Sequence, residues 1–470
     1  MKKVLSILIL FSAIINAQSL IAKIDSLIDI GKFNEANAII EEQENACDAF
    51  TKYELGFRKD LMDRIKIDFN KSEAEVKGYI RQYIPDFTEK DFIAWKKNRQ
   101  IEFFNINGED KYFHSAARNF FRINREASRI FTKVNNLTKD GLDKFLESYI
   151  PNTIGEIDFS KSNLTKSKKI KLHYQLSIPA NIIPANEVVR CWLPYPKEIP
   201  NRQFEVNLLK VNSDNYIIAP NNYPHRSIYL EKISKADEET IFEIILEYKS
   251  KDIKFKLAEL KNYGITEIPD SIKKYIAEEP PHIIFTEELK QLSERIVGGE
   301  LNKLSIAKLI YKWINDSIPW ASAREYSTIK NIPKYCIENR HGDCGIQSLL
   351  FITLCRLNGI PAKWQSGWML HPNEVNLHDW AEIYITDLGW VPVDQSFGLQ
   401  DLPDEEQKWF FFGGLDRFHL IINDDISKQF FPAKIYPRSE TVDFQRGEVE
   451  WRGGNLYFDK WDYHMDVEYE

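Results

Sequence analysis

The sequence lacks an excess of basic residues. Its 470 residues include 62 lysines and arginines against 70 aspartates and glutamates, which gives a formal net charge of −8 at pH 7. Proteins that hold a nucleic-acid backbone need clustered positive charge, because every phosphate they contact is anionic. We therefore expect no nucleic-acid partner for this chain.

Cysteine is also scarce. The five cysteines are Cys47, Cys191, Cys336, Cys344 and Cys355. So few thiols in a chain of this length cannot supply the disulfide framework that stabilises small secreted domains. Their odd number leaves at least one thiol unpaired, and such a thiol is either buried and inert or reactive.

Long apolar runs are absent after the first residues of the chain. Met1-Lys2-Lys3 precedes an apolar run from Val4 to Ile15, and Asn16-Ala17-Gln18 follows it. This order is typical of a secretory signal, here with cleavage after Ala17. The run is shorter than the ~20 residues that cross a bilayer; a buried N-terminal helix or an anchor is the alternative. We predict a signal peptide over residues 1–17, export to the periplasm or the outside of the cell, and no membrane insertion after signal removal.

No motif for a metal ion is recognisable. Cys336, His341 and Cys344 do not have the spacing of a zinc site, and no fourth ligand accompanies them. A calcium-binding loop would alternate acidic residues around a glycine, and the sequence has none. We expect neither a metal nor another cofactor, and we predict no particular oligomeric state.

What the chain does contain is enough apolar surface for several cores. Hydrophobic residues make up 43% of the chain and aromatic residues 13%, which predicts two to four domains. From Leu20 to about Ile130 apolar residues recur at intervals of three and four, as in amphipathic helices. Asn107-Gly108 predicts a short β-hairpin within this stretch. We predict a mainly helical N-terminal region over residues 18–160.

The period changes to two after Leu164. Apolar and polar residues then alternate, as in Ile170, Leu172, Tyr174, Leu176 and Ile178. This pattern favours a β-sandwich over residues 165–255. The helical period then returns and gives way to short strands, so residues 270–400 should form a helix-then-strand domain. The aromatic, β-rich residues 401–470 indicate an extension of that domain, and the predicted fold class is α+β.

One stretch combines a cysteine with the start of a helix. Gly342-Asp343-Cys344-Gly345 precedes apolar residues that share one helical face, namely Ile346, Leu349, Leu350, Leu354 and Leu357. Cys344 thus occupies the first turn, where the helix dipole favours a nucleophilic thiolate. Asp343 should cap the helix, but its charge opposes ionisation of the thiol. Whether Cys344 is a thiol or a thiolate therefore depends on a third group.

A predicted β-hairpin supplies that group. The strand-like run from His378 to Tyr384 turns at Asp387-Leu388-Gly389 and returns to Asp394. A hairpin of this length brings Asp394 back toward His378. His378 can then act as base and ion-pair partner for Cys344, while Asp394 orients the imidazole ring. The structural alternatives are a buried inert thiol, a hydrogen-bonded core histidine and a turn aspartate.

Three blocks of this sequence resemble one protein family. Gly-Asp-Cys-Gly at a helix start, His-x-Trp-x-Glu-x-Tyr and Gly-Trp-x-Pro-x-Asp occur in the order and spacing of the transglutaminase-like superfamily, over residues 290–400. The resemblance implies a papain-like catalytic core within residues 270–400, preceded by a β-sandwich, and a catalytic triad of Cys344, His378 and Asp394. It also implies that Cys344 attacks a carboxamide or peptide carbonyl, releases an amine, and passes the acyl group to water or another amine.

We predict an exported thiol enzyme whose partner is a peptide or protein amide. Hydrolysis is favoured over cross-linking, because water is abundant outside the cell. The Cys344 amide is the expected oxyanion donor, and Trp320 is a second candidate, as an upstream tryptophan is in some relatives. Trp380 and Trp368 are expected to wall the cleft. The alternative is a catalytically idle scaffold that kept this fold and binds a peptide or glycan.

Overall fold

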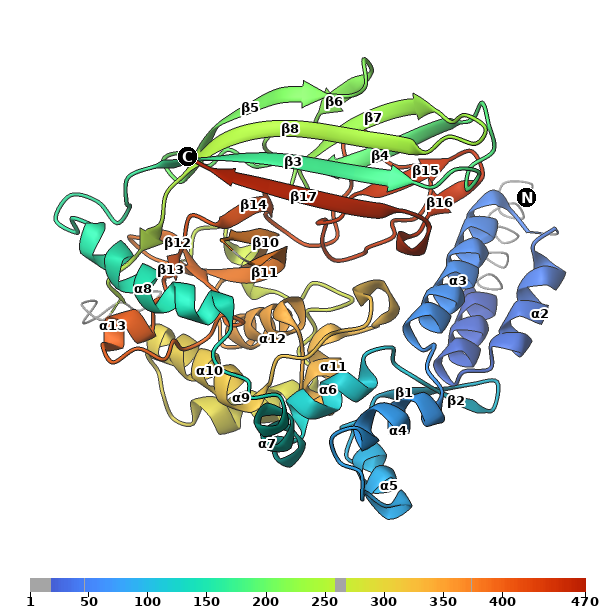
Figure 1. The fold of residues 1–470 in the computed structure, drawn as a ribbon, viewed down its shortest axis with the longest axis horizontal. Coiled ribbons are helices and arrows are strands. Elements are labelled where there is room, and N and C mark those ends of the chain that lie inside the picture. Colours follow the sequence, from blue (N-terminus) through green and yellow to red (C-terminus); the bar gives the residue numbers. More distant parts are fainter. Residues whose placement is uncertain (1–17, 46, 258–267, 373) are drawn as a thin grey trace, which may run out of the picture. The chain divides into compact units, whose positions relative to one another are not determined.

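The computed structural model describes residues 18–45, 47–257, 268–372 and 374–470 (Figure 1). The chain forms two compact units. Among the described residues, the first contains those up to Asn136 together with 327–329, and the second contains the rest from Leu137 onward. The predicted signal peptide, residues 1–17, lies outside the described residues. Within the described ranges, no helix is long and apolar enough to cross a lipid bilayer.

The first unit is mainly helical. A helix over residues 18–29 is followed by α2 Phe33–Gln43, α3 Ala49–Asp68, α4 Glu73–Arg81, α5 Glu89–Lys97, β1 Phe103–Ile106, β2 Glu109–Tyr112, α6 Ala116–Ile123 and α7 Arg125–Val134. Ser72 and Thr88 begin α4 and α5 with capping boxes. The predicted hairpin is confirmed, and Asn107 and Gly108 both have the positive φ that its tight turn requires.

Helix α8 (Gly141–Glu156) belongs to the second unit, although the prediction placed residues up to 160 in the N-terminal region. The rings of Phe145 and Tyr149 lie 5.6 and 5.3 Å from the ring of Phe418. The Tyr149 hydroxyl also donates to Oδ1 of the buried Asp252 at 2.8 Å. These long-range contacts attach the helix to the second unit, and helical periodicity gives no sign of them.

Two antiparallel sheets form one part of the second unit. Their orders are β17-β3-β8-β5 and β16-β15-β4-β7-β6. The strands are β3 Lys168–Ile178, β4 Val188–Pro194, β5 Gln203–Val211, β6 Tyr216–Ile218, β7 Ser227–Ile233, β8 Thr240–Ser250, β15 Glu448–Trp451, β16 Gly454–Leu456 and β17 Asp462–Tyr469. Alternate residues of β3 and β8 are buried, as their period predicted. The buried residues of both sheets share one hydrophobic core.

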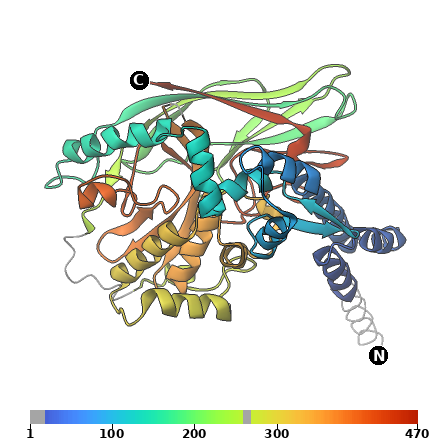
Figure 2. The same ribbon diagram turned by 60° about the horizontal axis from the view of Figure 1, so that its bottom comes forward.

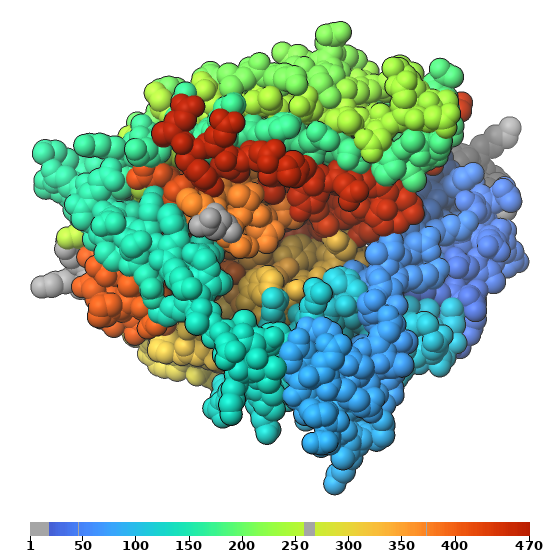
Figure 3. All heavy atoms as spheres, viewed as in Figure 1, coloured from blue at the N-terminus to red at the C-terminus, as the bar shows by residue number. Residues whose placement is uncertain are grey.

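Only part of residues 401–470 extends the helix-then-strand domain as predicted: β14 (His419–Asn423) pairs with β10 (Ala362–His371), but the later strands join the other sheets. Strand β17 pairs with β3 along its whole length, and β15 pairs with β4; Figures 1 and 3 show the red C-terminal strand along the green sheet residues. A short strand, β13 (Gly414–Leu415), pairs with β9 (Ile253–Lys254). Unpaired strand edges expose backbone N–H and C=O groups, so the tail completes sheets begun far earlier in the chain.

The predicted helix-then-strand order is present in the rest of the second unit. The short helix η2 Lys273–Ile276 is followed by α9 Glu287–Val297, α10 Lys303–Ser317, η3 Tyr326–Thr328, α11 Ile332–Asn339, α12 Cys344–Leu357, β10 Ala362–His371, β11 Glu374–Ile385, β12 Gly389–Val393, α13 Glu405–Lys408, β14 His419–Asn423 and, near the C-terminus, η4 Phe458–Lys460. The antiparallel sheet has the order β12-β11-β10-β14. Figure 2 shows orange strands of this part of the chain beside its yellow to orange helices. Every residue of α12 from Gly345 to Arg356 is buried, as expected for a helix enclosed by other elements. The mixture of helices and sheets confirms the predicted α+β class.

Candidate active site

Helix α12 begins at Cys344, as predicted. Asp343 is its N-cap, and the Asp343 carboxylate accepts a hydrogen bond from the Ile346 amide at 3.1 Å. Cys344 is the first residue of the helix, so its own N–H has no acceptor within the helix. This N–H lies beside the sulfur and is suited to bind an oxyanion.

The two glycines beside Cys344 permit close packing around the thiol. A Cβ atom at Gly345 would lie 2.2 Å from the hydroxyl oxygen of Tyr326, and one at Gly342 would lie 2.4 Å from Cγ2 of Ile346. Because Gly345 leaves this space, the Tyr326 hydroxyl can donate to Asp343 Oδ1 at 2.8 Å. The Gly-Asp-Cys-Gly order therefore reflects the space that Tyr326 and Ile346 occupy.

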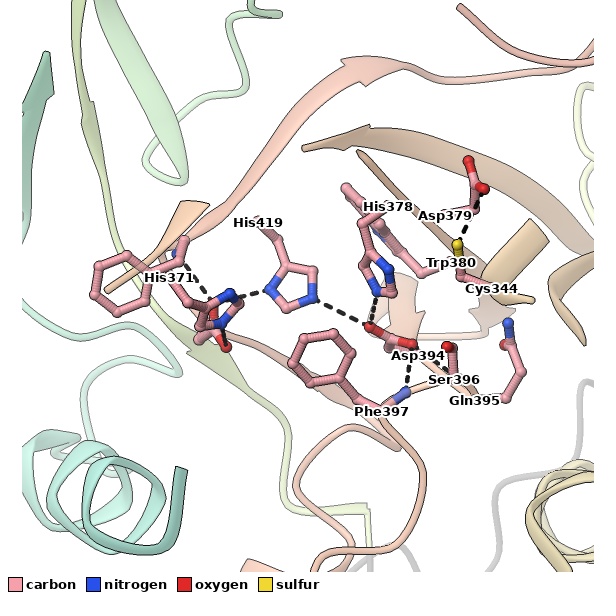
Figure 4. A network of polar contacts seen from close by, with 12 residues as sticks. Cys344, His371, His378, Asp379, Trp380, Asp394, Gln395, Ser396, Phe397 and His419 are labelled. Carbon is pink, nitrogen blue, oxygen red and sulfur yellow. Dashed lines mark hydrogen bonds and ion pairs between the residues drawn. The ribbon is translucent and has the colours of Figure 1, made fainter. Parts of the chain in front are cut away.

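His378 and Asp394 meet across the hairpin of β11 and β12. The strand register pairs Ala381 with Val393, so Asp394 follows the last paired residue of β12. His378 Nε2 lies 2.6 Å from Asp394 Oδ2, and both side chains are buried (Figure 4). The structure thus brings these two residues together as the hairpin pattern predicted.

Asp394 is ionised and sets the tautomer of His378. Burial would raise the pKa of Asp394, but the imidazoles of His378 and His419 hold it well below its ordinary value. Asp394 Oδ1 also accepts from the amides of Ser396 and Phe397, each at 3.0 Å. Because an ionised carboxylate can only accept, His378 Nε2 carries the proton and Nδ1 is its basic nitrogen. Burial lowers the pKa of His378 despite Asp394, so the ring is neutral at pH 7.

The Cys344 thiol has a different partner from the predicted one. Its Sγ donates to Asp379 Oδ2 at 3.3 Å, and within the described parts of the chain no hydrogen bond joins it to His378. Burial, followed by the carboxylates of Asp379 and Asp343, raises the pKa of the thiol well above its ordinary value. In this arrangement the thiol is protonated, and the predicted ion pair with His378 is not formed.

The residues of this site fall within a stretch that matches a known family. Comparison of the sequence with protein families matches residues 290–395 to the transglutaminase-like superfamily. The match runs from α9 to just beyond β12 and includes Cys344, His378 and Asp394. Residues 290–395 form a transglutaminase-like domain. The resemblance inferred from the three sequence blocks is confirmed for this part of the chain.

The relatives of the chain are distant. An uncharacterized protein of Haemophilus influenzae is 24% identical over 237 residues, and the match covers 44% of this chain and 63% of that protein, less than two thirds of its length. Among solved structures, a candidate cysteine protease from Cytophaga hutchinsonii is 16% identical, with a TM-score of 0.43 over 65% of this chain and 91% of that one. The periplasmic domain of TgpA from Pseudomonas aeruginosa is 12% identical, with a TM-score of 0.26 over 52% and 93%.

Cys344 of the transglutaminase-like domain lines a cleft of about 230 Å³. One side of the cleft comes from the segment between α10 and α11, including Trp320 and Tyr326, and another from the C-terminal residues Glu440, Asp443, Gln445 and Arg446. Figure 3 shows the surface hollowed between the yellow to orange helical residues and the red C-terminal residues. The tail therefore contributes directly to the surroundings of the thiol, which was not predicted.

Trp320 borders this cleft, whereas Trp380 and Trp368 do not. Trp320 is 43% exposed and lines the cleft together with Cys344. Trp380 is fully buried, donates to Gln365 Oε1 at 2.8 Å and stacks on His378 with ring centroids 5.7 Å apart. Trp368 is also buried, and its indole donates to a backbone carbonyl. The prediction that Trp380 and Trp368 wall the cleft is wrong, because both indoles have their partners in the core.

Buried acids surround the thiol of the transglutaminase-like domain. Burial, together with Asp343, raises the pKa of Asp379 to about 8, and burial raises the pKa of Asp343 to about 6. Burial also raises the pKa values of Glu440 and Asp443 well above their ordinary range. Asp379, Glu440 and Asp443 were not predicted, because an isolated acidic residue in a sequence usually belongs to the solvated surface.

We expect the substitution Asp379→Asn to make Cys344 more reactive. Burial raises the pKa of Asp379 to about 8, so its carboxyl becomes a carboxylate as the pH rises through 8. Asparagine removes that negative charge from beside the sulfur, and its amide can donate to a thiolate. Above pH 8 the rate of iodoacetamide labelling should rise about tenfold for each unit by which the pKa of the thiol falls. Peptide mapping of labelled Cys344 across a pH series measures this rate.

Asp443→Asn is the matched control for that experiment. Asp443 is a second buried carboxylate of the same cleft, and its interaction is with Asp379. Its replacement should change the labelling rate much less. Equal rates in the two variants, or an unchanged rate in Asp379→Asn, would contradict the role that we assign to Asp379.

Proposed function

We propose that this protein is a thiol-dependent acyl-transfer enzyme that acts on peptide or glutamine-type amides. The supporting observation is the position of Cys344 at the start of α12, in a cleft of the same domain that holds the hydrogen-bonded His378 and Asp394 pair. A nucleophile, a base and a group that orients the base are the components that transfer through a thioester requires.

The proposed reaction begins when the Cys344 thiol turns from Asp379 to His378 and gives its proton to Nδ1. The thiolate attacks the amide carbon, a C–S bond forms, and the Cys344 N–H binds the oxyanion, with Trp320 as a second donor. The protonated His378 then gives its proton to the leaving amine as the C–N bond breaks, which leaves a thioester on Cys344. Water, deprotonated by His378, attacks the thioester and releases a carboxylic acid and the free thiol.

Hydrolysis is the proposed main outcome. Water and amines compete for the same thioester, and the product depends on which of them reaches the acyl carbon first. Residues 1–17 have the sequence of a secretory signal, and we propose export to the periplasm or beyond on that basis. Water far exceeds any free amine in such a compartment, so the released product should be the acid.

Mass spectrometry of the mature full-length protein tests the proposal. After incubation with glutamine-containing peptides and an acid quench, the peptide that contains Cys344 should carry an acyl group that hydroxylamine removes. With methylamine present, most of the product should still be free acid, accompanied by an equal amount of ammonia or of new peptide N-termini.

Two other outcomes would change the assignment. A majority of methylamine adducts would assign amine transfer, and hence cross-linking, instead of hydrolysis. Peptide binding without any acyl group on Cys344 would favour the idle scaffold. The observation that favours the idle scaffold is the hydrogen bond that the Cys344 thiol donates to Asp379.

A further inference from the structure

Five buried side chains, of which His378 is the first, are joined in series by hydrogen bonds (Figure 4). Beyond the pair of His378 and Asp394, His419 Nε2 lies 3.1 Å from the same carboxylate oxygen, Asp394 Oδ2. His419 Nδ1 lies 2.8 Å from Asp416 Oδ1, and Asp416 Oδ2 lies 2.8 Å from His371 Nε2. None of the five side chains is more than 4% exposed. We name these five residues the histidine–aspartate series.

The sheet with the order β12-β11-β10-β14 brings the members of this series together. His371 ends β10, His378 lies in β11, Asp394 follows β12, and His419 begins β14. Asp416 precedes His419 by three positions and is held by the amide of Phe418, which donates to its Oδ1 at 3.0 Å. Because the members lie in or directly beside all four strands of this sheet, the series exists only when the sheet is complete.

The contacts are hydrogen bonds rather than the ligand set of a metal ion. Each contact joins one histidine nitrogen to one carboxylate oxygen at 2.6 to 3.1 Å, as charge-assisted hydrogen bonds do. Around a zinc ion with bonds of about 2.0 Å, tetrahedral ligand atoms stand roughly 3.3 Å apart. Four of the six ring nitrogens of the series already face a carboxylate, so a metal bound to these nitrogens would have to displace the hydrogen bonds.

His419 is positively charged within the series. Both of its ring nitrogens face carboxylate oxygens, so both donate and the ring is an imidazolium. Burial would lower its pKa, but Asp416 and Asp394 raise the pKa of His419 to about 9. Although burial would raise the pKa of Asp416, His371 and His419 hold it well below its ordinary value. The charged ring therefore shares the negative charge of Asp394 with His378.

The groups packed around the series change little in charge near neutral pH. Arg202 donates from Nη2 to the carbonyl of Asp416 at 2.7 Å and stays charged. Tyr149, from α8, and Tyr311, whose hydroxyl donates to the Asp394 carbonyl at 3.0 Å, have pKa values that burial raises, so both stay neutral. On the cleft side, Asp379 titrates near pH 8, and the Asp379→Asn variant controls for it.

We propose that His419 is a positioning residue for the reaction. Its charged ring holds the Asp394 carboxylate in place. The same positive charge weakens the stabilisation that Asp394 gives to the protonated form of His378. The proposal rests on the proposed function of Cys344. It explains how His378 stays neutral in the resting protein and can take the thiol proton at Nδ1. On the other side of the His419 ring, the Asp416 carboxylate stabilises the positive charge of His419, and His371 is hydrogen-bonded to that carboxylate.

The experiment compares His419→Gln with the wild type in the full-length mature protein. Glutamine keeps a hydrogen-bond donor beside Asp394 and removes the positive charge. We expect kcat/KM for amide hydrolysis at neutral pH to fall about 10- to 100-fold, as for other residues that orient a reacting group indirectly. The acid limb of its pH profile should move to higher pH, because His378 becomes easier to protonate. Asp416→Asn weakens the charge on His419 and should move the limb in the same direction.

His282→Gln serves as the control. His282 is 2% exposed and lies outside the series, and its Nδ1 accepts a hydrogen bond from the Ile332 amide. Its replacement should leave the acid limb where it is. A folded His419→Gln protein with an unchanged acid limb would overturn the proposal. If His419→Gln does not fold, the position of the acid limb in the pH profile of Asp416→Asn tests the proposal instead.

An NMR titration separates this proposal from the proposed function. The ring nitrogens of His378 can be followed in protein labelled with nitrogen-15 histidine, whether or not the protein turns over an amide. A wild type without thiol-dependent turnover contradicts the proposed function alone. A higher titration midpoint of His378 in His419→Gln than in the wild type supports the proposal, and equal midpoints overturn it.

Discussion

Cys344→Ala is expected to abolish amide turnover and to leave the fold intact. The substitution removes the sulfur that would form the thioester, and Cys344 is the only cysteine among the described residues that line the cleft. The loss should be about 10⁶-fold, the size found when the nucleophile of a catalytic triad is removed. Stability should change little, because Cys344 is only partly buried and its thiol donates a single hydrogen bond. Steady-state rates and a thermal melt measure the two effects.

Cys355→Ala and Cys336→Ala are matched controls for the nucleophile. Both thiols are buried and lie outside the cleft. Cys355 is eleven positions further along α12 than Cys344, about 16 Å away at 1.5 Å per residue. These variants should keep near wild-type turnover, although the volume they vacate lowers the free energy of unfolding. If Cys344→Ala hydrolysed amides as fast as these controls, the assignment of Cys344 as the nucleophile would be wrong.

Asp394→Asn is expected to lower turnover about 10⁴-fold, as the equivalent change does in other triads. Asp394 Oδ2 accepts from His378 at 2.6 Å and from His419 at 3.1 Å. Asparagine offers one acceptor oxygen, and its NH₂ group would face an imidazole N–H. His378 would then turn or take the other tautomer, which places a proton on the nitrogen that must accept the thiol proton. Activity should remain above that of Cys344→Ala, because the nucleophile and the oxyanion donors are still present.

Asp416→Asn is the matched control for Asp394→Asn. It makes the same chemical change to a carboxylate of the same buried series, but Asp416 does not contact His378. Its loss of kcat/KM should be at least tenfold smaller, as expected for a residue that acts through its neighbours. Similar losses in the two variants would mean that Asp394 has no special part in orienting His378.

The parts of the candidate site that the sequence predicted are local. Asp343 and Cys344 are neighbours, so the cap and the helix start can be recognised from spacing alone. His378 and Asp394 are 16 positions apart, but one tight turn joins their strands, and a hairpin's register follows from its turn. Residues this close in the chain influence each other's conformation directly.

The interpretations that failed concern partners that are distant in the sequence. Trp380 lies two positions from His378 and was assigned to the cleft, yet it donates to Gln365 on the neighbouring strand. Residues 401–470 are predicted to extend the helix-then-strand domain, and β14 does join its sheet, yet β15 and β17 pair with strands more than 200 positions earlier. Local periodicity shows that a strand exists but does not show which edge it joins.

By itself, the sequence determined the α+β class, the transglutaminase-like domain and the residues of the candidate triad. These features depend on periodicity, capping and turns, which act over a few residues. Only the tertiary structure decided what surrounds the triad: the thiol is bonded to Asp379, the C-terminal acids border the cleft, and His419 shares the carboxylate of Asp394. The physical reason is that burial and long-range strand pairing set the charge and the partners of these groups, and neither leaves a periodic signal in the sequence.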